Sequence, residues 1–236
     1  DSDCSGGSDY DADEDGHDII GYEDGDDCAD EDPARIDCSD GIADYLEGEP
    51  YGPVAYHSVE TDSGNDRLIL YGGQSYHQLN GSTNAYSLST DEWSSIDTAG
   101  IDPGERMGHA SAIDDTAGKM FIFGGQMYHT LSDELLVFDT TTNTWSFAEI
   151  VDHSGYRPPP LTGASMVYDP ALDELHIFGG QGYHGLNNEL WTYSVSADTW
   201  TGSVYETGPF AAGMVAVFNA DASDEGMRPG IAFGGQ

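Results

Sequence analysis

Positive charge is scarce in this sequence. The 236 residues include 44 Asp and Glu but only six Lys and Arg, which gives a formal net charge of −38. Nucleic acids and anionic membranes are bound through positive charge, so the composition argues against both as partners. Repulsion among so many carboxylates strains a compact chain unless bound cations or salt screen it. The composition therefore predicts calcium binding or a saline environment.

Long apolar runs are also absent. No stretch approaches the roughly 18 apolar residues of a membrane span, and no charged-then-apolar signal segment opens the chain. Insertion into a membrane is therefore not expected. The chain begins at Asp1 rather than at Met, which indicates a processed or excerpted protein.

Cysteine is confined to the first part of the chain, at Cys4, Cys28 and Cys38. Residues 1–50 also hold 20 acidic residues against Arg35 alone, so we treat them as an acidic leader, separate from residues 51–236. Two of the three cysteines could pair, and a disulfide would imply an oxidising compartment. We therefore expect an extracellular or cell-surface location.

Internal repeats dominate the rest of the sequence. Gly-Gly-Gln recurs at 72–74, 124–126, 179–181 and 234–236, with spacings of 52, 55 and 55 residues. An aromatic residue is followed seven positions later by Trp in three units, as Tyr86 and Trp93, Phe138 and Trp145, and Tyr193 and Trp200. Several markers in phase predict stacked units of about 50 residues.

Each unit reads as four short strands. The second unit shows GHASAI, KMFIFGG, ELLVFD and NTWSFAEI, joined by turn-rich stretches, and no segment has convincing helical periodicity. A four-stranded sheet repeated at this period is typical of β-propeller blades, which bury their faces against one another. The expected fold is therefore all-β.

These markers resemble the kelch family, whose blade carries a double glycine after its second strand and a Tyr-to-Trp spacing across its third and fourth strands. The resemblance spans about residues 53–236 and implies kelch-like β-propeller blades. Three full blades are expected at about 54–96, 106–150 and 161–206, and a partial blade at 210–236. The partial blade would leave an open edge, which a longer chain, residues 40–52 or another subunit would complete.

In the leader, carboxylates at alternating positions precede a glycine that permits a sharp turn, as in Asp11-Ala-Asp13-Glu-Asp15-Gly16, an arrangement that suits calcium. It resembles the Asp- and Cys-rich calcium-binding repeats of thrombospondins and metal-binding segments of bacterial surface proteins, which implies an irregular cation-binding leader. Oxygen ligands favour Ca²⁺ over zinc or copper. A disordered acidic tail is the alternative. The candidate ligands are Asp9, Asp11, Asp13, Asp15, Asp18, Asp24, Asp26, Asp30 and Asp32, and the candidate disulfide joins Cys28 and Cys38.

A second candidate site is the motif Gly-Gly-Gln-x-Tyr-His-x-Leu, in the loop after the second strand of each blade. The kelch resemblance implies that this loop lies on the face where partners dock, where Tyr and His could grip a ligand or a metal. Alternatively, each copy faces the same neighbour and simply packs or hydrogen-bonds to the next blade. The candidate residues are Tyr76, His77, Tyr128, His129, Tyr183 and His184.

Other aromatic positions suggest packing roles. Trp93, Trp145 and Trp200 are expected between blades, whereas Trp191 falls outside the pattern and is expected to be exposed. His57 and His109, both 15 residues before a double glycine, are expected in the core or between blades.

Three functions are compatible with these patterns. The first is an extracellular, non-enzymatic binding or adhesion module with a calcium-stabilised leader, which engages a protein or a glycan. The second is a self-associating structural subunit of an extracellular filament or surface layer. The third is a fragment of a propeller enzyme. Some kelch relatives are copper radical oxidases that use a Tyr–Cys crosslink, but every cysteine here lies outside the expected blades.

Overall fold

The computed structural model describes residues 54–75, 78–149, 157–204, 212–213, 215–217 and 231–233. Within these residues the regular elements are strands, apart from one 3-10 turn at Ser63–Asn65. The all-β prediction is therefore confirmed. The described residues include no helix that is long and apolar enough to cross a membrane.

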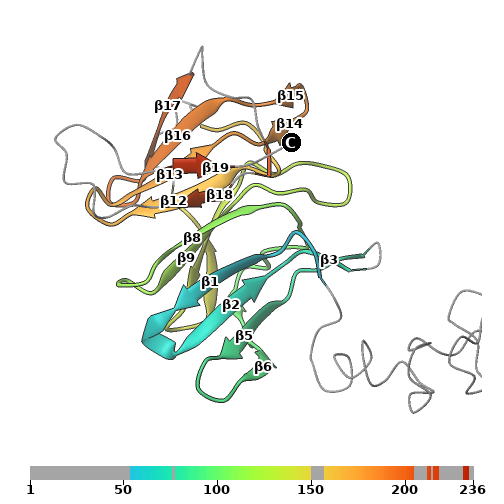
Figure 1. Cartoon of the computed structure of the whole chain (residues 1–236), viewed down its shortest axis with the longest axis vertical. Coiled ribbons are helices and arrows are strands. Elements are labelled where there is room, and N and C mark those ends of the chain that lie inside the picture. The colour runs from blue at the N-terminus through green and yellow to red at the C-terminus, as the bar shows by residue number, and fades with distance from the viewer. Residues whose placement is uncertain are drawn as a thin grey trace, which may run out of the picture. The chain divides into compact units, whose positions relative to one another are not determined.

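Three antiparallel sheets follow one another along the chain and form blades one, two and three (Figure 1). Blade one contains β1 (Ser58–Asp62), β2 (Arg67–Tyr71), β5 (Thr83–Ser87) and β6 (Glu92–Ser95). Blade two contains β8 (Ala110–Asp114), β9 (Lys119–Phe123), β10 (Leu135–Asp139) and β11 (Thr144–Phe147), and β7 (Ala99–Gly100) lies parallel to β11. Blade three contains β12 (Ser165–Asp169), β13 (Glu174–Phe178), β16 (Glu189–Ser194) and β17 (Thr199–Val204).

Shorter strands complete the description. β18 (Val215–Val217) pairs with β19 (Ile231–Phe233) and represents the partial fourth blade. Two small hairpins lie in the loops that follow the second strands. They are formed by β3 (Gln74–Ser75) with β4 (Gln78–Leu79), and by β14 (Gln181–Gly182) with β15 (Gly185–Leu186).

The blades are arranged around their first strands. β1 contacts β8, β8 contacts β12, and β12 contacts β18. A ladder of backbone hydrogen bonds runs across the start of these strands: Gly108 N–H donates to Tyr56 O at 2.8 Å, Gly163 N–H to Gly108 O at 2.7 Å, and Gly213 N–H to Gly163 O at 2.7 Å. The same sheet is thus repeated about a common axis, as in a kelch-type propeller.

The core lies between the blades. The ring of Trp145 in blade two lies 4.8 Å from the ring of Tyr71 in blade one, and its Nε1–H donates to Thr83 Oγ1 at 3.0 Å. Trp200 of blade three lies 5.9 Å from Phe123 of blade two in the same way. Burying each indole against the preceding blade stabilises the stack, because aromatic side chains remove a large apolar area from water.

The tyrosine of the Tyr-to-Trp spacing also stabilises the turn between the third and fourth strands of blade three. Tyr193 Oη donates to Asp198 Oδ1 at 2.8 Å, and Asp198 has the left-handed φ of 53° that starts the return strand. Blade two has Phe138 and Asn143 at these positions. There, Asn143 Oδ1 accepts a hydrogen bond from Arg67 Nη2 of blade one at 3.1 Å.

The expected exposure of Trp191 is wrong. Its side chain is buried, and its Nε1–H donates to Glu189 Oε2 at 2.9 Å. A Cβ on Gly202 would lie 2.7 Å from the Trp191 ring, so the neighbouring strand packs its backbone directly on the indole. Trp191 therefore belongs to the core between blades two and three.

Candidate binding site on the loop face

The connections between strands lie at two ends of the sheets. The loops after the second strands, at 72–82, 124–134 and 179–188, and the connectors between blades form one end, which we call the loop face. The tight turns between first and second strands and between third and fourth strands form the other end, which we call the hairpin face. The Tyr-His motifs of blades two and three thus lie on the loop face.

The double glycines position these loops. Gly72 and Gly124 have φ of 69°, and a Cβ on Gly124 would lie 2.5 Å from Leu161 O. The second glycine then bonds to the connector that follows, because Gly73 N–H donates to Arg106 O and Gly125 N–H to Leu161 O, both at 2.8 Å. The glycines are therefore required for the close approach of each connector to the strand end.

Arg106 fixes the base of the blade-two loop. Its buried guanidinium donates to Gly124 O at 3.0 Å and Pro103 O at 2.6 Å, and it forms an ion pair with Glu134 at 2.9 Å. The Nη1 and Nη2 donors are paired in this way, which makes the buried charge tolerable, whereas Arg106 Nε–H has no hydrogen-bond partner among the described residues. Blades one and three have Val54 and Leu161 at this position, so the anchor is specific to blade two.

Tyr183 reaches from the loop of blade three to the loop of blade two. Its hydroxyl oxygen accepts a hydrogen bond from Leu131 N–H at 2.7 Å and lies 2.7 Å from Thr130 Oγ1. These bonds to Thr130 and Leu131 lower the pKa of Tyr183. The side chain is nevertheless 63% exposed. The ring is thus held at its hydroxyl end while much of its surface stays accessible.

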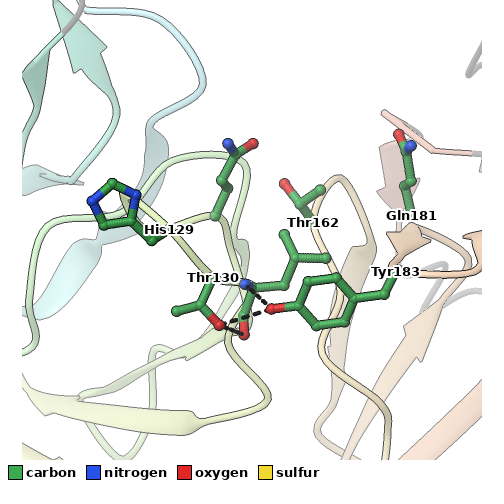
Figure 2. A pocket seen from close by; sticks show the side chains of 8 residues that line it. His129, Thr130, Thr162, Gln181 and Tyr183 are labelled. Carbon is green, nitrogen blue, oxygen red and sulfur yellow. Dashed lines mark hydrogen bonds between the residues drawn. The ribbon is translucent and has the colours of Figure 1, made fainter.

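A pocket of about 260 Å³ opens between these two loops. Figure 2 shows the Tyr183 ring crossing between the loops. Carboxamides, hydroxyls and an imidazole supply both donors and acceptors there. The volume lies below the usual range for drug-sized ligands, so the pocket suits a single side chain or a comparably small group. It is lined by Gln126, His129, Thr130, Leu131, Thr162, Gln181, Gly182 and Tyr183.

The six predicted loop residues do not share one environment. His129 and Tyr183 line the pocket, whereas Tyr128 is 54% exposed with its ring 6.5 Å from that of His129. His184 is exposed in the turn of the blade-three hairpin. Residues 76 and 77, where Tyr76 and His77 were predicted, lie outside the described part of the chain. Among the residues described, no three His, Cys, Asp or Glu side chains gather in a group suited to a metal ion.

The two histidines that were expected in the core or between blades also differ. His109 is buried between blades one and two, with Nε2 2.8 Å from Ser58 Oγ. Burial, with a contribution from the charge of Arg106, lowers the pKa of His109 to about 3. His57 in blade one is exposed, so the expectation of a core or inter-blade position is wrong for this residue. His109 is therefore a neutral packing residue across the whole physiological range.

Sequence reasoning missed two features of this face. Thr162 lines the pocket from the connector, which carries no repeated motif. Tyr56 adopts a φ of 59°, and aligned blades place Gly108 and Gly163 at the same position. Aligning the blades by sequence alone would have revealed this feature, because an aromatic residue is unusual at a position that is otherwise glycine.

The leader lies outside the described residues. The nine candidate calcium ligands between Asp9 and Asp32, the Cys28–Cys38 disulfide and the domain boundary at residue 50 therefore stay predictions.

Repeated four-stranded blades with double-glycine loops define a kelch-type propeller segment. The family model of the KLHDC2/KLHL20/DRC7 Kelch-repeats domain matches residues 43–201. The chain therefore belongs to the kelch-repeat family, and the resemblance noted from its motifs is confirmed. Kelch repeats imply a protein-binding module.

Curated relatives and a solved structure agree. Kelch repeat-containing protein 2 of Saccharomyces cerevisiae is 30% identical over 156 residues, which cover 60% of this chain and 17% of the relative. Tip elongation aberrant protein 1 of Schizosaccharomyces pombe is 28% identical, over 53% of this chain and 11% of the relative. The structure of YjhT superposes with a TM-score of 0.58 at 17% identity, covering 73% of this chain and 58% of that one. This chain thus spans less than a fifth of the two fungal relatives.

The expected extracellular or cell-surface location is wrong. The yeast relatives and the similar acyl-CoA-binding domain-containing proteins of Arabidopsis thaliana are intracellular kelch-repeat proteins. The expectation rested on acidic composition and on a possible disulfide. Neither is specific, because a net negative charge also keeps proteins in solution inside cells.

Most kelch relatives are non-enzymatic binding proteins, but one similar protein is an enzyme. The N-(sulfonatooxy)prop-2-enimidothioate sulfolyase of Thlaspi arvense is 24% identical over 65% of this chain and 44% of the relative.

Proposed function

We propose that this chain is a non-enzymatic binding module that holds a polypeptide segment on its loop face, with one partner side chain in the pocket between blades two and three. The observation that carries this proposal is Tyr183. Its hydroxyl is bonded to the neighbouring blade, while its ring is left exposed beside the pocket.

A fixed aromatic ring favours binding for a thermodynamic reason. Association costs free energy wherever it immobilises a side chain, and an aromatic anchor that is already ordered avoids part of that cost. Tyr183 is ordered by hydrogen bonds at 2.7 Å to two residues of blade two. The position of the ring therefore follows from the packing of the two blades.

The pocket favours a peptide group over catalysis. It offers the carboxamides of Gln126 and Gln181, the hydroxyl of Thr162 and backbone groups, which can bond to the amide groups of an extended chain. No Asp, Glu, Lys or Arg is among the residues that line it. The absence of a carboxylate pair or a nucleophile–base pair at this pocket supports a binding role over an enzymatic one.

The test is capture of peptides from a displayed library by the whole chain. Tyr183→Ala should abolish enrichment, because it removes both the ring and the link between the loops. Tyr183→Phe should retain part of it, because the ring remains but its hydroxyl bonds are lost. Leu172→Ala is the matched control, since Leu172 is 51% exposed in the first turn of blade three on the hairpin face.

Enrichment that is insensitive to Tyr183→Ala would contradict the proposal. A glycan array provides the second outcome: selective glycan capture that depends on Tyr183 would assign the pocket to a sugar rather than to a peptide.

A further inference from the structure

Tyr56 has a backbone conformation that an aromatic residue rarely adopts. Its φ is 59°, in the left-handed region, where a Cβ crowds the backbone. The equivalent positions of the following blades are Gly108, Gly163 and Gly213, with φ of 62°, 64° and 68°. The fold therefore demands a left-handed residue here in each blade, and three times the sequence supplies glycine.

Hydrogen bonds on both sides hold Tyr56 in this conformation. Tyr56 O accepts the bond from Gly108 N–H that joins blade one to blade two. The preceding residue, Ala55, exchanges two backbone hydrogen bonds with Gln74, at 2.9 and 2.8 Å. The strain is thus imposed by the inter-blade ladder rather than by the side chain.

The Tyr56 side chain is mostly exposed rather than packed against the fold. Tyr56 is 67% exposed, the largest exposed fraction among the large apolar side chains that the structure describes as exposed. At the equivalent position in blade two, a Cβ on Gly108 would lie 2.5 Å from Thr162 Oγ1. Glycine is required there, whereas the space beside Tyr56 admits a ring that then projects into solvent. Strain without packing is characteristic of functional positions.

The charge near Tyr56 indicates which kind of partner group its ring would bind. The last part of the connector, residues 101–109, leads to Gly108 beside Tyr56 and carries Asp102 and Glu105. Its one basic residue, Arg106, is buried and paired with Glu134. An exposed aromatic face in a negative field attracts a cation, both through the ring quadrupole and through long-range steering.

We propose that Tyr56 is an anchor on the loop face for an arginine or lysine of a basic partner segment. This inference rests on the proposed function and names the chemistry of its partner. Tyr128 and Tyr183 are also exposed aromatic residues, in loops of the same face. The formal charge of −38 on the chain favours the same partner class.

Fluorescence titration tests this with a Gly-Ser peptide that carries three arginines, beside matched peptides in which citrulline or glutamate replaces arginine. The arginine peptide should bind most tightly and the glutamate peptide most weakly. Tyr56→Gly should weaken the arginine peptide by about two- to fivefold, the range expected for an exposed cation–π contact. Tyr56→Phe should restore binding, because it keeps the ring.

Thermal unfolding of the same variants separates binding from folding. Tyr56→Gly should leave the midpoint unchanged or raise it, because glycine relieves the left-handed strain. A clear fall in the midpoint, or arginine-peptide binding that is unchanged by Tyr56→Gly, would overturn the inference. If Tyr183→Ala abolishes library enrichment while Tyr56→Gly and citrulline have no effect, the proposed function stands and only this inference fails. If neither variant matters, both fail.

Discussion

The two blade interfaces of this propeller segment are built from the same repeat but with different chemistry. Between blades one and two, His109 bonds to Ser58 at 2.8 Å and Ser111 Oγ donates to Glu60 Oε1 at 2.5 Å. Between blades two and three the corresponding region is mainly apolar. Its cluster includes Ala110, Ala112, Phe123, Met166 and Ile177. The repeat thus specifies where blades meet, and individual residues decide whether the contact is polar, and therefore sensitive to pH, or apolar.

Each interface buries a repeated tryptophan, Trp145 between blades one and two and Trp200 between blades two and three. The largest expected effect comes from removing such a residue. Trp145→Ala should destabilise the chain by about 3–5 kcal/mol, because it leaves a cavity between blades one and two and removes the donor to Thr83. Chemical denaturation followed by circular dichroism measures this. The control is Trp93→Ala, which should cost less because Trp93 is only half-buried. Equal losses for the two variants would show that burial of the indole is not what matters.

The second prediction concerns His109 and tests whether the polar interface responds to pH. The pKa of His109 is lowered to about 3, so the unfolded chain binds a proton between pH 6.5 and about 3 that the folded chain does not. The contribution of the neutral His109 to the unfolding free energy is thus fully present above pH 6.5. It is lost as the pH falls toward 3, by a few kcal/mol at most. Denaturation of the wild type and of His109→Gln across this range measures it.

The variant supplies the control for that experiment, because glutamine keeps a polar group near Ser58 and does not titrate. Its unfolding free energy should decline less steeply with acid than that of the wild type. Parallel pH profiles for the two proteins would contradict the assignment of a buried neutral imidazole.

Sequence patterns predicted the framework well, for an identifiable reason. The Gly-Gly-Gln and Tyr-to-Trp spacings fix the strand ends, and Trp145 and Trp200 are buried between blades as expected. Trp191 was misjudged because its burial depends on Gly202 of the neighbouring strand, a contact that no repeat spacing encodes. The repeat spacing does not predict the hydrogen bond from Leu131 N–H to the Tyr183 hydroxyl either. A motif shows that a tyrosine recurs, but its partner belongs to another blade.

Glu60 gives a smaller effect with the opposite dependence on pH. Burial raises the pKa of Glu60, although the hydrogen bond from Ser111 partly offsets it. The folded chain therefore favours the protonated carboxyl, and this contribution to stability is present below the ordinary pKa of about 4.5 and lost as the pH rises through the folded value. Glu60→Gln should be more stable than the wild type at pH 7 and should lose that advantage near pH 4. A variant that is less stable than the wild type at pH 7 would show that the carboxylate is favourable at this interface.

The last prediction concerns calcium, which should bind the leader but have the smallest effect on the stability of the blades. We propose that residues 1–50 bind Ca²⁺ through the alternating carboxylates between Asp9 and Asp32, since oxygen ligands and intervening glycines suit that ion. Calorimetric titration should then detect calcium binding to the whole chain, and Asp11→Asn with Asp13→Asn should weaken it. The midpoint of blade unfolding should hardly move with calcium or chelator, because the described blade residues contain no group of three metal-binding side chains. Size-exclusion chromatography of the same samples tests self-association. A calcium-dependent shift to larger species, absent in the Asp11 and Asp13 variant, would assign the leader a role in assembly, whereas calcium-dependent blade stability would place the ion among the blades instead.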